Sequence, residues 1–324
     1  AMFAPLLGVP YPSLTAHRLR TLHEKGVRHL AHLGGTCPPE AVPFNVNHEM
    51  LLALQFDPDL DIDATVERIA FDWAGGRFGG ALRRAWALTE EAVLAYPNVT
   101  PLYSTMGFIW YRLWARPLVP NIEAIAPEDR AYYERFMCTT PHNPNNVDLS
   151  RDVLFQLTTA DECERAIARI DEHVWGPIDE AIATLEEIRH EAGAELGEGN
   201  VIDDQFVRLS ALRCWLMTQR NVAAWVAGVH GWLAATTDTG RREYRGRLRD
   251  AVDREIENTH RLAALLESPI EFMSLTDRGE TPLVYGDNLK GLLSKRIALM
   301  EAHRDDEPYI DPDYIERQAG TVLA

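Results

Sequence analysis

Apolar residues recur at steps of three and four from position 161 to position 267, and this spacing constrains the fold more than any other feature. It predicts amphipathic helices over 161–194, 201–235 and 240–267, because residues three and four apart share one helix face. The first helix is expected to kink at Gly176-Pro177. Short links between three long helices favour an antiparallel bundle.

Composition narrows the class of protein. The 324 residues include 46% hydrophobic and 25% charged residues, and the net charge is -17. Such a charge argues against nucleic acid as a partner, and no apolar run approaches the roughly 20 residues of a membrane span. Four cysteines lie far apart, and the first residues lack the features of a secretory signal, so we expect a cytoplasmic protein with unpaired thiols.

The first 50 residues show a different pattern. Two short apolar runs, 2–8 and 27–33, flank a helix that begins near Ser13 and ends at Gly26. Strand, helix and strand in this order predict a βαβ unit over 1–50, which requires a parallel pairing. One such unit cannot complete a parallel sheet.

The segment 51–270 is expected to form a helical domain. Its first helix breaks at Pro58, a second starts at Asp61 or Asp63 and stops at Gly75-Gly76, and a third is closed by Pro97-Asn98. In the remainder, 271–324, the sequence pattern predicts one β-hairpin over 272–286, a helix over 287–303 and an acidic tail. The predicted fold class is therefore mainly α.

Metal-binding and nucleotide-binding motifs are recognised by the spacing of their residues. Aspartates at 57, 59, 61 and 63 resemble a calcium loop, but its sixth and twelfth positions hold Ile62 and Arg68 where Gly and Glu are needed. His29 and His32 would point to opposite faces of a strand. The chain has no H-E-x-x-H, G-x-G-x-x-G or Walker motif, so we expect neither a metal nor a cofactor.

Polar and aromatic side chains suggest contacts to a carbohydrate. The proline-rich stretch after Gly34-Gly35 ends in asparagines and His48-Glu49, and a cluster near 110 combines tryptophans with arginines, which suits sugar stacking and bidentate hydrogen bonds. A third polar loop spans 137–152. The alternative for the aromatic cluster near 110 is packing in the core. The alternative for the loop 137–152 is a surface crossing between helices. The candidate substrate-binding residues are Asn45, Asn47, His48, Glu49, Trp110, Arg112 and His142.

The order of features over 27–80 resembles part of certain glycoside hydrolases. A strand with a Gly-Gly exit, the loop "PPEAVPFNVNHEM" and the phrase "LQFDPDLDIDATVERIAFDWAGGRFG" are similar to the exit from a (β/α)8 barrel into a C-terminal helical domain. The α-glucuronidases of family 67 resemble it most, and the hexosaminidases of families 84 and 20 have similar exits. The helices after residue 80 resemble the helical domain of these enzymes only in general character.

The resemblance implies a role for each part. The runs 2–8 and 27–33 would be the last barrel strands, 34–49 would lie at the rim of a sugar pocket, and the helices would form an accessory domain that makes a homo-oligomer. A whole barrel needs about 250 residues, so its catalytic carboxylates would lie upstream. The rim carboxylates here are Glu40 and Glu49, and neither is assigned as catalytic.

Three functional hypotheses follow. In the first, the chain is the C-terminal helical portion of a carbohydrate-active hydrolase that cleaves a uronic acid or hexosaminide linkage, and it is catalytically incomplete. In the second, it is a non-catalytic helical interaction or oligomerisation module. In the third, a self-contained enzyme would need converging carboxylates between helices, but solvated faces explain pairs such as Glu90-Glu91 and Glu186-Glu187 better.

Overall fold

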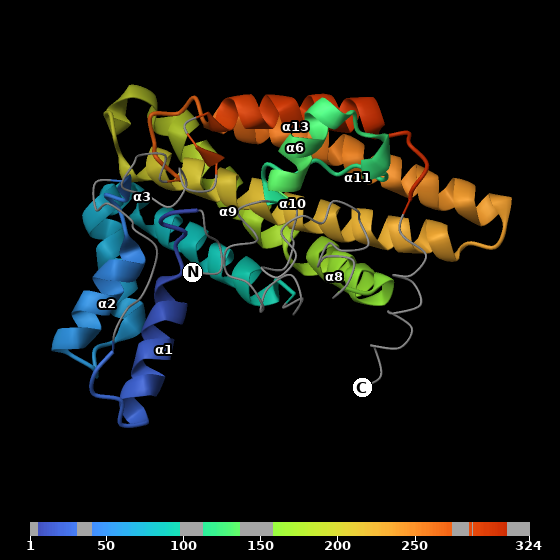
Figure 1. Ribbon diagram of the computed structural model, residues 1–324. Coiled ribbons are helices and arrows are strands. Elements are labelled where there is room, and N and C mark those ends of the chain that lie inside the picture. Colours follow the sequence, from blue (N-terminus) through green and yellow to red (C-terminus); the bar gives the residue numbers. More distant parts are fainter. Residues whose placement is uncertain are drawn as a thin grey trace. The chain divides into compact units, whose positions relative to one another are not determined.

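The computed structural model describes residues 6–30, 41–97, 113–136, 158–273, 285–286 and 288–309 (Figure 1). Most of these residues are helical, which confirms the predicted mainly-α class. The chain divides into two compact units, each discontinuous in sequence. Unit 1 comprises Ala1–Tyr96, Ile170–Arg213 and Glu267–Leu283, and unit 2 comprises Pro97–Arg169, Cys214–Leu266 and Val284–Ala324. The expected domain boundaries near 50 and 270 stay predictions.

The helices fall into the two units as follows. Unit 1 holds α1 (Pro12–Glu24), α2 (Val46–Phe56), α3 (Ile62–Ala95), α9 (Trp175–Ala192) and the 3-10 helix η4 (Gly193–Leu196). Unit 2 holds η2 (Ile122–Ala124), α6 (Pro127–Arg135), α11 (Asp238–Leu265) and α13 (Leu289–His303). Residues of α8 (Ala160–His173) and α10 (Val201–Ala234) belong to both units.

The long helices lie close to where the periodicity predicts them. The predicted helix 161–194 is divided at Val174, two residues before the expected kink, into α8 and α9. The predicted helices 201–235 and 240–267 correspond to α10 and α11. Asp61 is the N-cap of α3, and its carboxylate accepts a hydrogen bond from the Ala64 backbone N–H at 3.0 Å. The capping signal was therefore sufficient to place this helix start.

Helix α3 is folded back on itself at Gly75. The backbone there has φ 71° and ψ 174°, a region open essentially to glycine alone. Arg83 lies 3.1 Å from Glu67, yet 16 residues of straight helix would separate them by about 24 Å. A side chain at Gly79 would come within 2.8 Å of the Phe71 backbone, so the two arms touch. The predicted stop at Gly75-Gly76 is thus a sharp reversal.

Unit 1 contains an antiparallel set of helices. The second arm of α3 runs against α9, because Arg84 pairs with Glu180 while Arg77 pairs with Glu191 further along. The same unit has an aromatic cluster in which Trp73 contacts Phe44 and Trp86 edge to face, with ring centroids 5.5 and 5.7 Å away. These contacts tie the turn of α3 to the segment that precedes α2.

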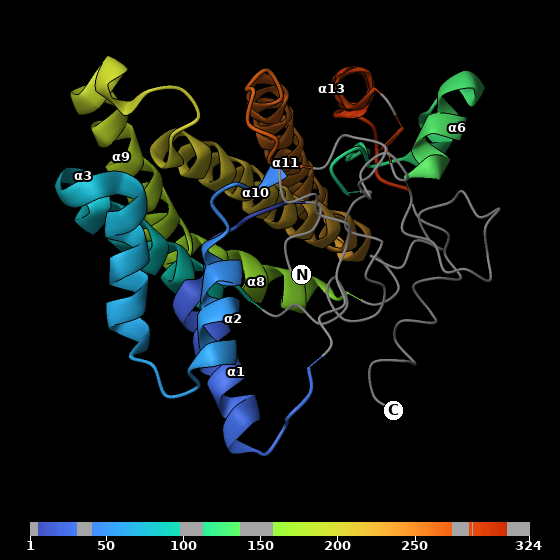
Figure 2. The same cartoon turned by 90° about the vertical axis from the view of Figure 1, so that its left-hand side faces the viewer.

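Helices α1 and α2 lie side by side in the same unit, as Figures 1 and 2 show. Ala16 on α1 and Met50 on α2 are completely buried. Their opposite faces reach solvent and carry mostly polar residues, apart from Leu52 and Phe56 of α2. The two helices therefore form an amphipathic pair whose apolar sides face the interior.

Unit 2 is built on an antiparallel helix pair. Within this unit the α10 residues Cys214 and Asn221 lie opposite the α11 residues Asn258 and Glu255, respectively, so that the sequence numbers run in opposite directions. Helix α13 packs on α11. Trp114 and Trp215 make an edge-to-face contact with centroids 5.3 Å apart, and both rings are buried. The antiparallel pairing expected for these long helices is present.

The described residues do not support the βαβ unit or the late hairpin. Residues 27–30 form no strand, and 31–33 lie outside the described part of the chain, as does 274–284. The two segments expected to belong to separate β structures instead meet: Leu6 bridges Met273 in antiparallel fashion, and Leu7 N–H donates to Phe272 O at 2.9 Å. Short apolar runs satisfy burial without specifying a strand, which explains the error.

None of the described helices combines the length and apolar character required to traverse a lipid bilayer.

Candidate functional site

The predicted rim residues lie at the start of α2, where two of them serve the backbone. The Asn45 side chain accepts a hydrogen bond from the His48 backbone N–H at 3.2 Å and so caps the helix. Asn47 accepts from Tyr11 N–H at 2.8 Å and donates to Val9 O at 2.7 Å. Both amides therefore hold local structure together.

The next two rim residues reach solvent. His48 and Glu49 are exposed, and Glu49 stands in the first turn of α2, where a negative charge suits the helix dipole. The other candidates, Trp110, Arg112 and His142, lie outside the described residues, so their roles stay predictions, and the rim carboxylate Glu40 lies outside them as well.

A buried ion pair lies directly beneath this segment. Arg208 and Asp204, one turn apart on α10, form a bidentate pair with Nε to Oδ2 at 2.9 Å and Nη2 to Oδ1 at 2.8 Å. Their side chains are 1% and 4% exposed. A buried pair of this kind persists only where further hydrogen bonds complete both partners, because burial removes the water that would solvate the charges.

Those further bonds go to the backbone of three separate segments. The guanidinium of Arg208 donates to Leu7 O at 2.9 Å, to Ala41 O at 2.7 Å and to Glu271 O at 3.3 Å. Together with the bonds to Asp204, all five N–H donors of the guanidinium are used. The arginine thereby fastens three non-helical segments of unit 1 to one helix.

Gln205 adds a second attachment. Its Nε2 donates to Asp204 at 2.9 Å and to Phe44 O at 3.5 Å, while its Oε1 accepts from the Trp86 indole at 3.1 Å. The carbonyls of Ala41 and Phe44 are thus held to α10, and Gln205 is linked in turn to Trp86 of α3. We call Asp204, Gln205 and Arg208 the loop anchor.

The loop anchor was missed in the sequence. Its signal was present: a charged pair at i, i+4 stands in a helix whose neighbouring positions Leu209 and Leu212 are apolar and buried. Charged residues are rarely fully buried unless they are paired, so such a pair in a buried helix indicates an internal ion pair.

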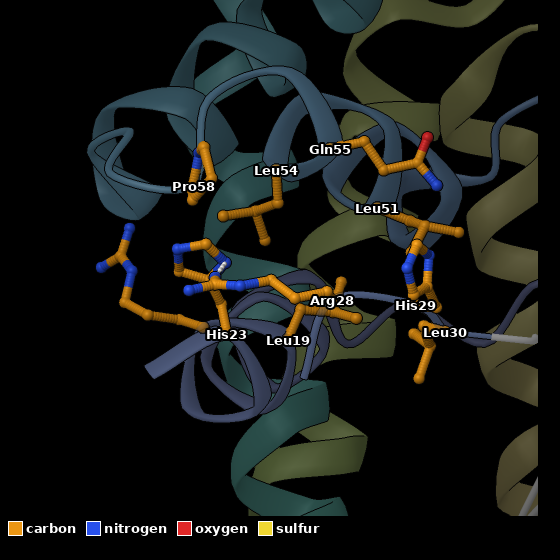
Figure 3. Close-up of a pocket in the computed structure, with 10 residues that line it drawn as sticks. Leu19, His23, Arg28, His29, Leu30, Leu51, Leu54, Gln55 and Pro58 are labelled. Carbon is orange, nitrogen blue, oxygen red and sulfur yellow. Dashed lines mark hydrogen bonds between the residues drawn. The ribbon is translucent and has the colours of Figure 1, made fainter. Parts of the chain in front are cut away.

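A hollow of about 370 Å³ opens between α1 and α2 (Figure 3). Its apolar side chains come from both helices and include Leu19, Leu51 and Leu54, and Pro58 closes one end. The remaining lining residues are Arg20, His23, Arg28, His29, Leu30 and Gln55. Apart from Gln55, the polar groups in this hollow are arginines and histidines.

Its two arginines have few partners. Arg28 Nη1 lies 3.4 Å from Nδ1 of His23, the contact drawn in Figure 3. Arg20 donates from Nη2 to Leu60 O, whereas its buried Nε has no hydrogen-bond partner among the described residues. In the described part of the chain, neither arginine has a carboxylate within 4 Å.

The carboxylate of Glu90 supplies the missing cap of α1. It accepts from the backbone N–H groups of Ser13 at 2.6 Å and Leu14 at 3.2 Å. Burial raises the pKa of Glu90, and the two backbone hydrogen bonds oppose that rise. The helix was expected to begin near Ser13, and it begins at Pro12 with no side-chain cap from Tyr11. Glu90 therefore has a structural partner and is not simply a solvated helix residue.

Unit 2 contains a second buried charge network, centred on Glu255 of α11. Its Oε1 accepts from Thr218 at 2.6 Å and pairs with Arg296 at 2.8 Å, while its Oε2 accepts from Asn221 at 2.7 Å and from Asn258 at 3.4 Å. Glu255 and Arg296 are both fully buried. This network joins residues of α10, α11 and α13 within the unit.

Arg296 completes its hydrogen bonds on the backbone. It donates to Arg116 O at 2.8 Å, to Leu113 O at 3.2 Å and to the hydroxyl of Thr259. The carboxylate and the guanidinium each have several partners, which is the arrangement expected of a structural ion pair.

Metal and thiol chemistry find no support in the described part of the chain. Within it, no group of three or more His, Cys, Asp or Glu side chains is arranged to hold a metal ion. Cys163 is buried, and burial raises the pKa of its thiol to about 12. This thiol is therefore protonated at neutral pH and is a poor nucleophile.

Comparison with known proteins finds no match to any family model, to any curated protein or to any solved structure.

Proposed function

We propose that the chain is the C-terminal helical portion of a carbohydrate-active glycoside hydrolase, and that it contributes a rim loop and an oligomerisation surface while the catalytic carboxylates lie upstream. The proposal combines the resemblance over 27–80 with one structural observation. That observation is the loop anchor, which binds Ala41 and Phe44 of the rim segment to α10.

The loop anchor supports the proposal because a sugar-binding loop benefits from being held in advance. Ordering a loop when ligand binds costs conformational entropy, and a loop already fixed by buried hydrogen bonds avoids part of that cost. A buried ion pair that serves three backbone segments is more than local helix stability requires. Asn45 and Asn47 then stabilise the loop, while His48 and Glu49 are the described rim side chains that face solvent.

The test is binding without turnover. The purified chain is titrated by calorimetry with an aldouronic oligosaccharide and with a chitin oligosaccharide, and hydrolysis of aryl glycosides is assayed in parallel. We expect one of the two sugars to bind and neither aryl glycoside to be hydrolysed. Hydrolysis that disappears in Glu40→Gln or Glu49→Gln would contradict the upstream position of the catalytic pair.

The alternative, a helical interaction module, is favoured by one surface feature. Phe56 at the end of α2 is 89% exposed, and Leu52 is exposed one turn earlier on the same helix. Absence of sugar binding, together with a molecular mass in light scattering that falls to the monomer value in Phe56→Ser, would favour this module over the hydrolase portion.

A further inference from the structure

We propose that the hollow between α1 and α2 binds a small organic carboxylate with an apolar body. This assignment goes beyond the proposed function, because it concerns lining residues outside the rim segment 41–49 and a ligand that need not be a sugar. Its support comes from the charge, the buried donor and the apolar surface of the hollow, taken in turn.

The first argument is local charge. The chain carries a net charge of -17, yet the short segment from His17 to His29 contains four arginine or lysine residues and one acidic residue, Glu24. Elsewhere arginines such as Arg68 find carboxylates readily. Arg20 and Arg28, which line the hollow, have none within 4 Å among the described residues. A cationic recess in an acidic protein favours an anionic ligand.

The second argument is the unpaired donor on Arg20. Among the described residues its buried Nε has no hydrogen-bond partner, and Nη2 donates to Leu60 O. An incompletely bonded buried guanidinium is uncommon in folded proteins. A carboxylate in the hollow would supply acceptors to the donors of Arg20 that line it, because its two oxygens match the planar guanidinium fork.

The third argument is the apolar lining, which distinguishes a carboxylate from a simple phosphate ion. Leu19, Leu51 and Leu54 present hydrocarbon surface inside the hollow. Its volume of about 370 Å³ suits a small molecule, since ligand pockets measure about 300 to 1,000 Å³. Inorganic phosphate would leave the leucine surface uncovered, whereas an apolar ring or chain beside the carboxylate would bury it.

The test uses benzoate as the probe and benzamide as its neutral analogue. Binding to the whole chain is measured by calorimetry and by amide shifts of Leu51 and Gln55 in nitrogen-15 correlation spectra. We expect benzoate to bind, benzamide to bind at least about tenfold more weakly, and Arg28→Gln and Arg20→Gln each to weaken benzoate about tenfold, as the loss of a charged hydrogen bond implies.

The matched control is Arg18→Gln, which removes the same charge from an exposed position of α1 outside the lining. We expect it to change benzoate affinity by less than about twofold, since Arg18 does not line the hollow and an exposed charge that does not contact the ligand is screened. Circular dichroism confirms that each variant is folded, and Arg28 is exposed enough for its replacement to leave the fold intact. No benzoate binding at millimolar concentration, equal binding of benzamide or inorganic phosphate, or an equal loss in Arg18→Gln would overturn the proposal.

Discussion

The two units bury an arginine–carboxylate pair in different ways. In unit 1 the cation is the centre: Arg208 binds Asp204 and three backbone carbonyls from distant segments. In unit 2 the anion has more side-chain partners: Glu255 accepts from three uncharged side chains as well as from Arg296, which itself donates to two backbone carbonyls. The first arrangement fastens backbone segments to one helix, and the second mainly joins three helices.

The largest effect is expected from removing the cation of unit 1. Arg208→Met removes the donor to three carbonyls and leaves the buried Asp204 carboxylate with Gln205 as its remaining partner, and should lower the free energy of unfolding by about 3 to 5 kcal/mol. Urea unfolding followed by circular dichroism measures the change. Asp204→Asn should cost less, about 2 to 3 kcal/mol, because the amide oxygen can still accept from Arg208 although the amide nitrogen now faces a donor. A cost for Asp204→Asn equal to that of Arg208→Met would show that Arg208 is not the centre.

Removing the anion of unit 2 should come next. Glu255→Gln turns one acceptor oxygen into an amide that faces other donors, and should cost about 2 to 3 kcal/mol, since hydrogen bonds to charged groups contribute about 1.5 to 3 kcal/mol. Glu257→Gln, on an exposed pair with Arg261, is the control and should have a small effect. If both variants unfold at the same urea concentration, the Glu255 network contributes little.

The helix reversals of the two units differ as well. Unit 1 reverses α3 at the single residue Gly75, whereas α10 and α11 are joined through a short link that ends at the N-cap Thr237. Gly75→Ala should cost about 1 to 3 kcal/mol because alanine is strained at this φ and ψ. Thr237→Ala should cost about 1 kcal/mol through the lost cap. The reverse order in urea unfolding would mean that the α3 turn relaxes without strain.

The smallest effect concerns pH and is confined to unit 2. Burial lowers the pKa of His230, although a hydrogen bond from the imidazole to the Thr158 backbone opposes the shift. Below the unfolded pKa of about 6.5 the unfolded chain binds a proton that the folded chain resists, so stability is lost as pH falls from there toward the lowered folded pKa. His230→Gln should reduce the change in the free energy of unfolding between pH 7.5 and 5.5. The exposed control His260→Gln should not, and equal flattening by both would exclude His230 as the cause.

Helices were predictable from the sequence because each has local signals. Pro58 and the Asp61 cap place a helix boundary within a few residues, and the apolar spacing gives α10 and α11 their full lengths. The pairing of Leu7 was not predictable in the same way, because its backbone hydrogen bond to Phe272 depends on a partner far along the chain.

The site was harder to predict than the fold. In a sequence, an asparagine that follows prolines looks the same whether its side chain contacts a ligand or the protein backbone. Asn47 bonds to the backbone of Tyr11 and Val9. The role of Arg208 depends on three carbonyls that only the folded chain brings together. Charge density near Arg20 and Arg28 was visible in the sequence, but the hollow that gives it meaning was not.

The edge-to-face tryptophan pairs provide each unit with its own optical signal. Trp73 and Trp86 lie in unit 1, while Trp114 and Trp215 lie in unit 2. Closely coupled indole rings give near-ultraviolet circular dichroism bands that vanish when the packing is lost. Replacing one pair by phenylalanine would leave the other as a reporter, so the order in which the two units melt can be observed without attaching a dye.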